Sequence, residues 1–315
     1  MNKPEAKQYS AQVGGRSITL ETGKLAGQAG GAVTVRLGDS IVFAAATMGG
    51  VREGTDFFPL TVDYEERMYA GGRIPGSFFR REGRPSEDAI LISRLTDRPI
   101  RPLFPKNMRN EVQVIMFSVS ADTENGLDIL AVNAASAAIM ISDIPWGGPI
   151  GAVRVGRIDG QFIINPTFEQ KAKSNLDLRI AGTREAILMV ECGADIISEK
   201  DMVEALMFGH RELQPLIDIQ EKMAAEIGKP KREIELTAQD EILINHVRER
   251  VSAEVNAMLD APHMKAELNN NIAILEEAVV VELSTEDETL THSIKDAFDT
   301  VFKEIVRGRI IDRGQ

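Results

Sequence analysis

Residues 9–20 have the sequence YSAQVGGRSITL, in which two short β-type runs flank a Gly-Gly pair. A two-residue glycine turn between such runs is typical of a β-hairpin. Residues 32–37 and 40–47 repeat the pattern with apolar and β-branched side chains around a Gly-Asp pair. The beginning of the chain therefore predicts antiparallel β-structure.

The middle of the chain mixes strands and helices without regular alternation. Residues 85–96 have helical spacing, and residues 97–105 contain three prolines and are expected to leave that helix. Residues 128–141 are Ala-rich and apolar almost all round, which predicts a buried helix. Further strands are expected at 60–64, 111–120, 151–155, 161–164, 176–181 and 186–190. This irregular order favours an α+β fold over a doubly wound parallel sheet.

The last third of the chain predicts charged, amphipathic helices. They are expected to begin at 198, at 237 and near 284, and the last is expected to stop at Arg307 before Gly308. We therefore expect an α+β domain over 8–197 and an all-helical domain over 198–307. Residues 308–315 resemble the first strand of a further domain, which indicates a chain that has been cut there.

Composition excludes several classes of protein. With 315 residues, 43% of them hydrophobic and 27% charged, the chain is neither disordered nor fibrous. Its one cysteine, Cys192, cannot form an internal disulfide, and we expect it to be buried and inert. There is no signal-peptide pattern at the start and no apolar run long enough for a membrane span. A cytoplasmic location without membrane association is expected.

The charge is distributed unevenly. The net charge is −12, but residues 64–109 contain nine Arg and one Lys against six acidic residues, a local charge of +4. A segregated, Arg-rich segment is typical of a phosphate-binding surface, because guanidinium groups bind phosphate bidentately. The alternative is that these arginines pair with nearby acids or lie in a subunit interface.

Residues 71–85, GGRIPGSFFRREGRP, form the most unusual stretch of this segment. Four glycines predict a loop, and two adjacent aromatic residues next to two arginines offer stacking surfaces beside phosphate ligands. The stretch therefore favours binding of RNA or other single-stranded nucleic acid. Alternatively, Phe78 and Phe79 anchor the loop in the core.

This loop, together with LTDRPIRPLFP at 95–105, LETGKLA at 20–26 and FGH at 208–210, resembles the first half of the bacterial polynucleotide phosphorylase family. The resemblance implies an RNase PH-like β-sheet and helix domain, with a ribosomal-protein-like βα fold, followed by a helical domain. The full-length family chain adds a second RNase PH-like domain and KH and S1-type RNA-binding domains. Its members form ring-shaped homotrimers and degrade RNA from the 3′ end with phosphate, releasing nucleoside diphosphates in a reversible reaction assisted by magnesium.

The resemblance also implies roles for individual residues and partners. It places Phe78, Phe79, Arg80, Arg81 and Arg84 along the RNA path at the constriction of the ring, and Arg94, Arg98 and Arg101 near RNA or phosphate. The implied partners are single-stranded RNA, inorganic phosphate, nucleoside diphosphates, two further copies of the chain and other RNA-degradation proteins.

The chain departs from the family's catalytic half at two places. Where that half has a phosphate-binding Gly-Ser-Ser-Ser stretch, residues 126–129 are Gly-Leu-Asp-Ile, and Asp128 would repel phosphate. Where it has two metal-binding aspartates, this chain has Lys171 and Asp177, which do not make a magnesium site.

We therefore expect no catalytic or metal-binding residue in this half, and magnesium only in the full-length enzyme. The predicted parent protein is a phosphorolytic nucleotidyltransferase of mRNA degradation, of which this half guides RNA and builds the ring and is inactive alone. Two alternatives stay open: a non-catalytic RNA-binding or scaffold module, and a self-sufficient RNase PH-type exoribonuclease.

Overall fold

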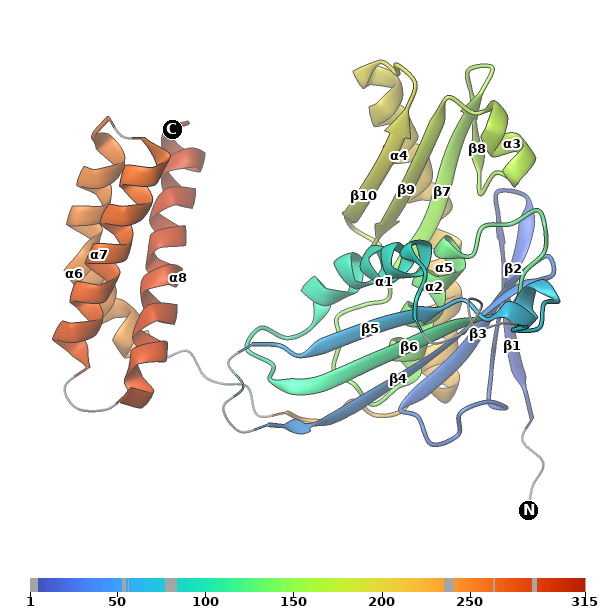
Figure 1. Ribbon diagram of the computed structural model, residues 1–315, viewed down its shortest axis with the longest axis horizontal. Helices are drawn as coiled ribbons and strands as arrows, with labels where there is room; N and C mark the ends of the chain where they lie inside the picture. Colours follow the sequence, from blue (N-terminus) through green and yellow to red (C-terminus); the bar gives the residue numbers. More distant parts are fainter. Residues whose placement is uncertain are drawn as a thin grey trace. The chain divides into compact units, whose positions relative to one another are not determined.

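The chain forms two compact units, residues 1–236 and 237–315, which are described separately (Figure 1). The computed structural model describes residues 5–52, 55, 57–76, 84–234, 241–262, 264–284 and 288–314. In these ranges, no helix combines the length and the apolar composition that crossing a membrane requires.

The first unit contains a six-stranded sheet with the order β1-β2-β3-β4-β6-β5. All neighbouring strands are antiparallel except β5 and β6. Gly14 and Gly15 join the first hairpin with φ angles of 57° and 77°, the left-handed region that a type I′ turn requires. Both predicted hairpins are confirmed. The strands are β1 (Lys7–Val13), β2 (Arg16–Thr22), β3 (Gly31–Leu37), β4 (Ser40–Val51), β5 (Leu60–Glu65) and β6 (Asn110–Ser120).

A second, four-stranded antiparallel sheet has the order β10-β9-β7-β8. Its strands are β7 (Gly151–Ile158), β8 (Gln161–Ile164), β9 (Leu176–Gly182) and β10 (Ile187–Ala194), and the short helix α3 (Phe168–Lys173) connects β8 to β9. With helices and two sheets in irregular order, the predicted α+β class is confirmed.

Helix α2 (Asp128–Ile141) packs against both sheets and is buried along almost its whole length, as its composition predicts (Figure 1). Small residues allow β3 to approach it closely: a Cβ atom on Gly31 would lie 2.1 Å from the carbonyl oxygen of Ala138. The Asn133 side chain bridges α2 to β7, donating to the Ala152 carbonyl oxygen at 2.9 Å and accepting from the Ala152 amide at 3.0 Å. This helix therefore fixes the position of the second sheet against the first.

Helix α1 (Glu87–Ile100) begins after Ser86, whose side chain accepts a hydrogen bond from the Ala89 amide at 3.1 Å. The helix runs through Pro99 to Ile100, four residues beyond the predicted end at 96, and the chain leaves it within residues 97–105 as expected. A 3₁₀ turn, η3 (Arg101–Leu103), follows directly, and another, η1 (Met68–Gly71), lies before α1. Pro99 cannot donate to the Leu95 carbonyl oxygen, and the α-helix ends one residue later, at Ile100.

Helices α4 (Glu199–Glu212) and α5 (Gln214–Ile227) belong to the first unit, which corrects the predicted boundary at 198. Their apolar faces complete the core of the two sheets, with Leu213, Leu216 and Met223 fully buried. After α5, Lys231 Nζ donates to three carbonyl oxygens at the C-terminal end of α2, at 2.8–3.1 Å. Tertiary packing, which helical periodicity does not reveal, therefore moves the boundary to residue 236.

The second unit consists of α6 (Glu241–Asp260), α7 (Lys265–Leu283) and α8 (Glu288–Arg313), packed around their own apolar core. Helix α7 was not predicted. Helix α8 continues through Gly308, so the predicted helix end at 307 and the expected strand after it are both wrong. Arg309 explains the continuation, because its guanidinium pairs with Asp260 and donates to Asn256 Oδ1 at 3.1 Å, holding the last turns of α8 against α6.

Candidate functional site

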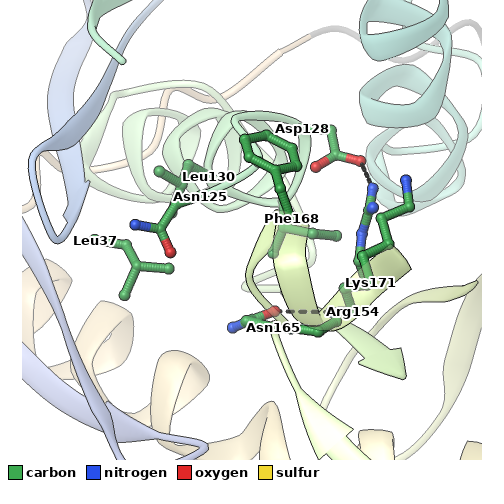
Figure 2. Close-up of a pocket in the computed structure, with 11 residues that line it drawn as sticks. Leu37, Asn125, Asp128, Leu130, Arg154, Asn165, Phe168 and Lys171 are labelled. Atoms are coloured by element: carbon green, nitrogen blue, oxygen red, sulfur yellow. Dashed lines mark hydrogen bonds and ion pairs between the residues drawn. The ribbon is translucent and has the colours of Figure 1, made fainter. Parts of the chain in front are cut away.

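A pocket of about 340 Å³ opens in the first unit between α1, the loop before α2, and the second sheet. Asp88 and Leu91 of α1 form one wall, and Phe168 and Lys171 of α3 another. A smaller cavity of about 20 Å³ adjoins it and shares Asp128, Phe168 and Lys171 (Figure 2). A pocket of the larger size suits a small molecule or a single nucleotide unit.

The loop before α2 is held in place by Asp122. Its carboxylate accepts hydrogen bonds from the amides of Glu124 and Asn125, at 2.9 and 2.7 Å, and from the Asn125 side chain at 2.7 Å. Burial alone would raise the pKa of Asp122, but these hydrogen bonds outweigh it and lower the pKa to about 2. The turn at 122–125, which leads into residues 126–129, is therefore held by a carboxylate that stays ionised at neutral pH.

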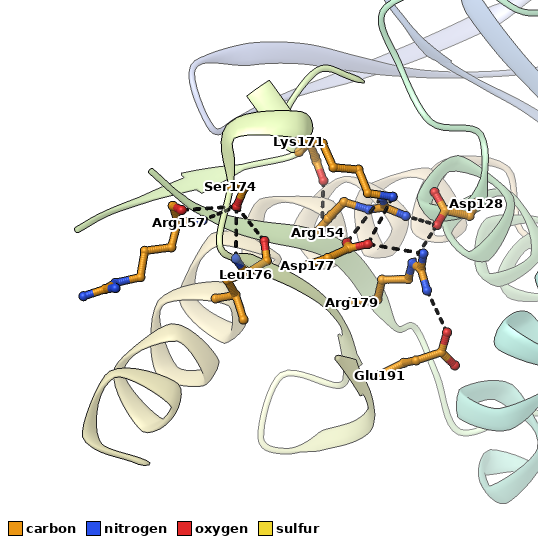
Figure 3. Close-up of polar contacts among 10 residues, drawn as sticks. Asp128, Arg154, Arg157, Lys171, Ser174, Leu176, Asp177, Arg179 and Glu191 are labelled. Atoms are coloured by element: carbon orange, nitrogen blue, oxygen red, sulfur yellow. Dashed lines mark hydrogen bonds and ion pairs between the residues drawn. The ribbon is translucent and has the colours of Figure 1, made fainter. Parts of the chain in front are cut away.

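A network of ion pairs, shown in Figure 3, includes five residues that line the pocket: Asp128, Arg154, Lys171, Arg179 and Glu191. Arg154 of β7, only 8% exposed, pairs with Asp128 and lies 3.3 Å from Asp177 Oδ1. Lys171 Nζ lies 3.1 Å from Asp177 Oδ2. Arg179 Nε lies 2.9 Å from Asp128 Oδ2, and its Nη2 lies 3.6 Å from Asp177 Oδ2. Three cations thus surround two carboxylates.

The network extends outward through Glu191 of β10. Arg179 Nη1 lies 2.7 Å from Glu191 Oε1, and Arg98 Nη1 of α1 lies 3.3 Å from Glu191 Oε2. Arg98 also donates to the Val190 carbonyl oxygen at 3.1 Å. These bonds join α1 to the edge of the second sheet, so the charges serve as cross-links between elements of the unit.

This arrangement does not fit a magnesium ion. Mg²⁺ needs several hard oxygen ligands that are free to coordinate it, whereas the oxygens of Asp128 and Asp177 face guanidinium and ammonium groups. Within the described ranges, no group of three His, Cys, Asp or Glu side chains is placed to hold a metal. Lys171 and Asp177 form an ion pair, a contact that the sequence did not predict.

The predicted RNA-binding residues fall into three groups. Phe78, Phe79, Arg80 and Arg81 lie outside the described residues. Arg84, ahead of α1, and Arg94, on its exposed face, are both exposed, and neither has an ion-pair partner among the residues that the structure describes. These two guanidinium groups are available to a phosphate.

Arg98 and Arg101 are engaged within the chain. Arg98 pairs with Glu191 as described, and Arg101 binds Asp97 through two nitrogens at 2.9 and 2.7 Å. Arg101 also lies over the Phe58 ring at 6.0 Å and donates to the Leu60 carbonyl oxygen at 3.2 Å. An RNA phosphate would compete with these contacts.

Sequence reasoning missed Arg154 and Arg179. Both stand in strands of the second sheet, at directly paired positions, and so lie side by side. An arginine among apolar residues, such as Arg154 in the GAVRV stretch of β7, indicates a buried charge, but only the strand register identifies its partners. Cys192 is exposed, contrary to the expectation of a buried thiol.

Comparison with known proteins shows the family to which this chain belongs. The model described as "3′ exoribonuclease family, domain 1" matches residues 14–145, and "3′ exoribonuclease family, domain 2" matches residues 148–212. The polyribonucleotide nucleotidyltransferase of Heliobacterium modesticaldum is 49% identical over 95% of this chain, and that of Thermus thermophilus is 47% identical over 97%. The chain spans 42% and 43% of the length of these two relatives.

A solved structure supports the fold. The crystal structure of rice (Oryza sativa) Rrp46 matches 71% of this chain and 96% of its own with a TM-score of 0.53 and 16% sequence identity. At this level of identity the likeness concerns the fold alone, and the expectation of an RNase PH-like architecture is confirmed.

Proposed function

Because this chain belongs to the 3′ exoribonuclease family, we propose that it is the RNA-guiding part of a phosphorolytic 3′-to-5′ exoribonuclease. In this proposal the phosphate-binding and metal-binding residues are supplied from outside this chain. The substrates are single-stranded RNA and inorganic phosphate, and the products are nucleoside diphosphates. Magnesium, supplied with the catalytic residues, would assist the reaction.

One observation supports the proposal that the catalytic residues lie outside this chain: the carboxylates of Asp128 and Asp177 are neutralised by ion pairs. Phosphorolysis needs positive charge directed at the transferring phosphoryl group. In this pocket Arg154, Lys171 and Arg179 are directed at Asp128 and Asp177 instead. The charges that could stabilise a phosphoryl group therefore stabilise the fold.

The RNA-guiding role is supported by the basic segment around α1. Arg84 and Arg94 present exposed guanidinium groups within residues 64–109, whose local charge is +4 in an acidic chain. Phosphate contacts of this kind bind any sequence, because every nucleotide carries the same charge. Phe78, Phe79, Arg80 and Arg81 would extend the same surface, with the aromatic rings stacking on bases.

The proposal is tested by measuring release of nucleoside diphosphate from an oligoadenylate by this chain alone, with phosphate and magnesium present. We expect no release, together with RNA binding that weakens as salt increases. Binding without salt dependence would contradict the guiding role. Phosphate-dependent release by material free of host enzyme, lost when Lys171 is changed to Ala, would show that this half contains a complete active site.

We further propose that the protein works as a ring-shaped homotrimer and associates with other RNA-degradation proteins. A trimer would surround the RNA path with three copies of the basic segment. Light scattering on the chain and on a version extended by the remainder of the protein tests this assembly. A monomeric extended protein would contradict it.

A further inference from the structure

Helix α7 has apolar side chains on two opposite faces. Leu275 and Val279 are buried in the core that α7 shares with α6 and α8. On the other side Ile274 is 59% exposed and Val281 is 73% exposed. Ala278, also exposed, stands between them, so the three residues follow the i, i+4, i+7 spacing of a single helical stripe.

The surroundings of this stripe are acidic. Glu277 lies one turn from both Ile274 and Val281, and Glu267 lies two turns before Ile274 on the same face. Both glutamates are exposed, and neither has an ion-pair partner among the described residues. The only cation of α7 is Lys265, at its first residue. Residues 237–315 contain 16 acidic and 8 basic residues, a net charge of −8.

An apolar stripe on a helix is well covered by the apolar stripe of another helix, because the side chains of the two stripes interdigitate along their length. The charge then selects the partner. RNA and anionic lipid carry the same sign as this unit, and a second copy would bring acidic flanks against acidic flanks. A small residue at the centre, Ala278, lets a partner backbone approach closely.

We propose that the Ile274-Ala278-Val281 stripe of α7 is a docking site for a basic, amphipathic helix of a partner protein. The apolar face of the partner covers the stripe, and its Lys or Arg residues pair with Glu267 and Glu277. This surface is independent of the RNA-guiding role, because all of its residues lie in the helical unit and none belongs to the basic segment.

The test uses the full chain and a synthetic peptide of Leu and Lys at helical spacing. Two control peptides are a Leu and Glu peptide of the same spacing and a Lys peptide with Ser in place of Leu. We expect only the first to bind. In the chain, Ile274→Ser with Val281→Ser should weaken binding about tenfold or more, from the apolar area no longer buried. Glu267→Gln with Glu277→Gln should flatten the salt dependence.

The matched control is Val203→Ser with Met207→Ser on α4, a pair 59% and 64% exposed in the first unit. It should leave binding unchanged. If the serine variant of α7 loses helix content, Ala278→Arg blocks the stripe while keeping a strong helix former. Equal binding to the blocked chain, equal loss in the α4 control, or a dimer that the α7 variants convert to a monomer would each overturn the proposal.

Discussion

Replacing Arg154 with Met tests whether the ion-pair network stabilises the fold. The side chain is 8% exposed and pairs with Asp128, itself 9% exposed. Removing one partner of a buried ion pair costs about 3–5 kcal/mol, because the other charge stays buried. Here Arg179 and Lys171 still face the two carboxylates at 2.9 and 3.1 Å. We therefore expect a loss at the lower end, about 3 kcal/mol of unfolding free energy.

Urea denaturation followed by tryptophan fluorescence measures this loss of unfolding free energy in the first compact unit, which contains the ion-pair network. The only tryptophan, Trp146, is buried in the first unit, where its indole donates to the Ile100 carbonyl oxygen at 2.9 Å. Its emission therefore reports unfolding of that unit alone. The control is Arg184→Met, since Arg184 also contacts two carboxylates, Asp218 and Glu221, but on the surface, where we expect little change.

A double variant completes the test. Adding Asp128→Asn to Arg154→Met removes the second member of a pair that is already broken, so the two losses of unfolding free energy should fall short of additivity by about 1 kcal/mol or more. A loss below about 1 kcal/mol for Arg154→Met would refute the network as a source of stability. Strictly additive effects of the two substitutions would refute the pairing itself.

Three further outcomes are expected. Arg84→Ala with Arg94→Ala should weaken binding of single-stranded RNA. The slope of the logarithm of the binding constant against the logarithm of salt concentration should become shallower by about 1.4, at about 0.7 per lost phosphate contact. An unchanged slope, measured by filter binding, would show that neither residue contacts the RNA. Asp122→Asn should cost about 1–2 kcal/mol at pH 7, since the pKa of Asp122 is lowered to about 2 in the fold. A carboxyl group whose pKa is lowered in the folded state stabilises the fold at pH values above its unfolded pKa. The difference in unfolding free energy between the protein and the variant should therefore be complete above pH 5 and about half lost by pH 3. A difference that does not change with pH would contradict this origin. Gly308→Ala should stabilise the second unit by about 0.5–1 kcal/mol, because Gly308 is inside α8 and an added Cβ would meet only Asp312 Oδ2, at 3.9 Å. Destabilisation in thermal unfolding followed by circular dichroism would mean that the helix ends there.

The local sequence was sufficient to predict the structure wherever the residues of one segment determine its conformation. The Gly-Gly turn determines the first hairpin because few other residues adopt the required φ angles. The apolar circumference of 128–141 predicts a buried helix from composition alone, and the structure confirms it. The ion pair between Lys171 and Asp177, at 3.1 Å, was not predicted from the sequence, which indicated only that these two residue types do not make a magnesium site.

The sequence was insufficient where a helix lacks a clear apolar face or a distant partner decides its extent. Apolar residues on two sides of α7 obscure its periodicity, so the helix was missed. Gly308 has the pattern of a helix end, but Arg309 binds Asn256 and Asp260 on α6 and keeps the helix intact. The roles of Phe78, Phe79, Arg80 and Arg81 stay predictions.

The chain by itself thus determined its hairpins, its central helix and its family. Only the tertiary structure decided that α4 and α5 belong to the first unit and that Arg154 and Arg179 neutralise Asp128 and Asp177. The physical reason is that turns and apolar periodicity act between neighbours in sequence. Charge compensation depends on distance in space, and residues 26 and 51 positions apart meet only once strand register has brought them together.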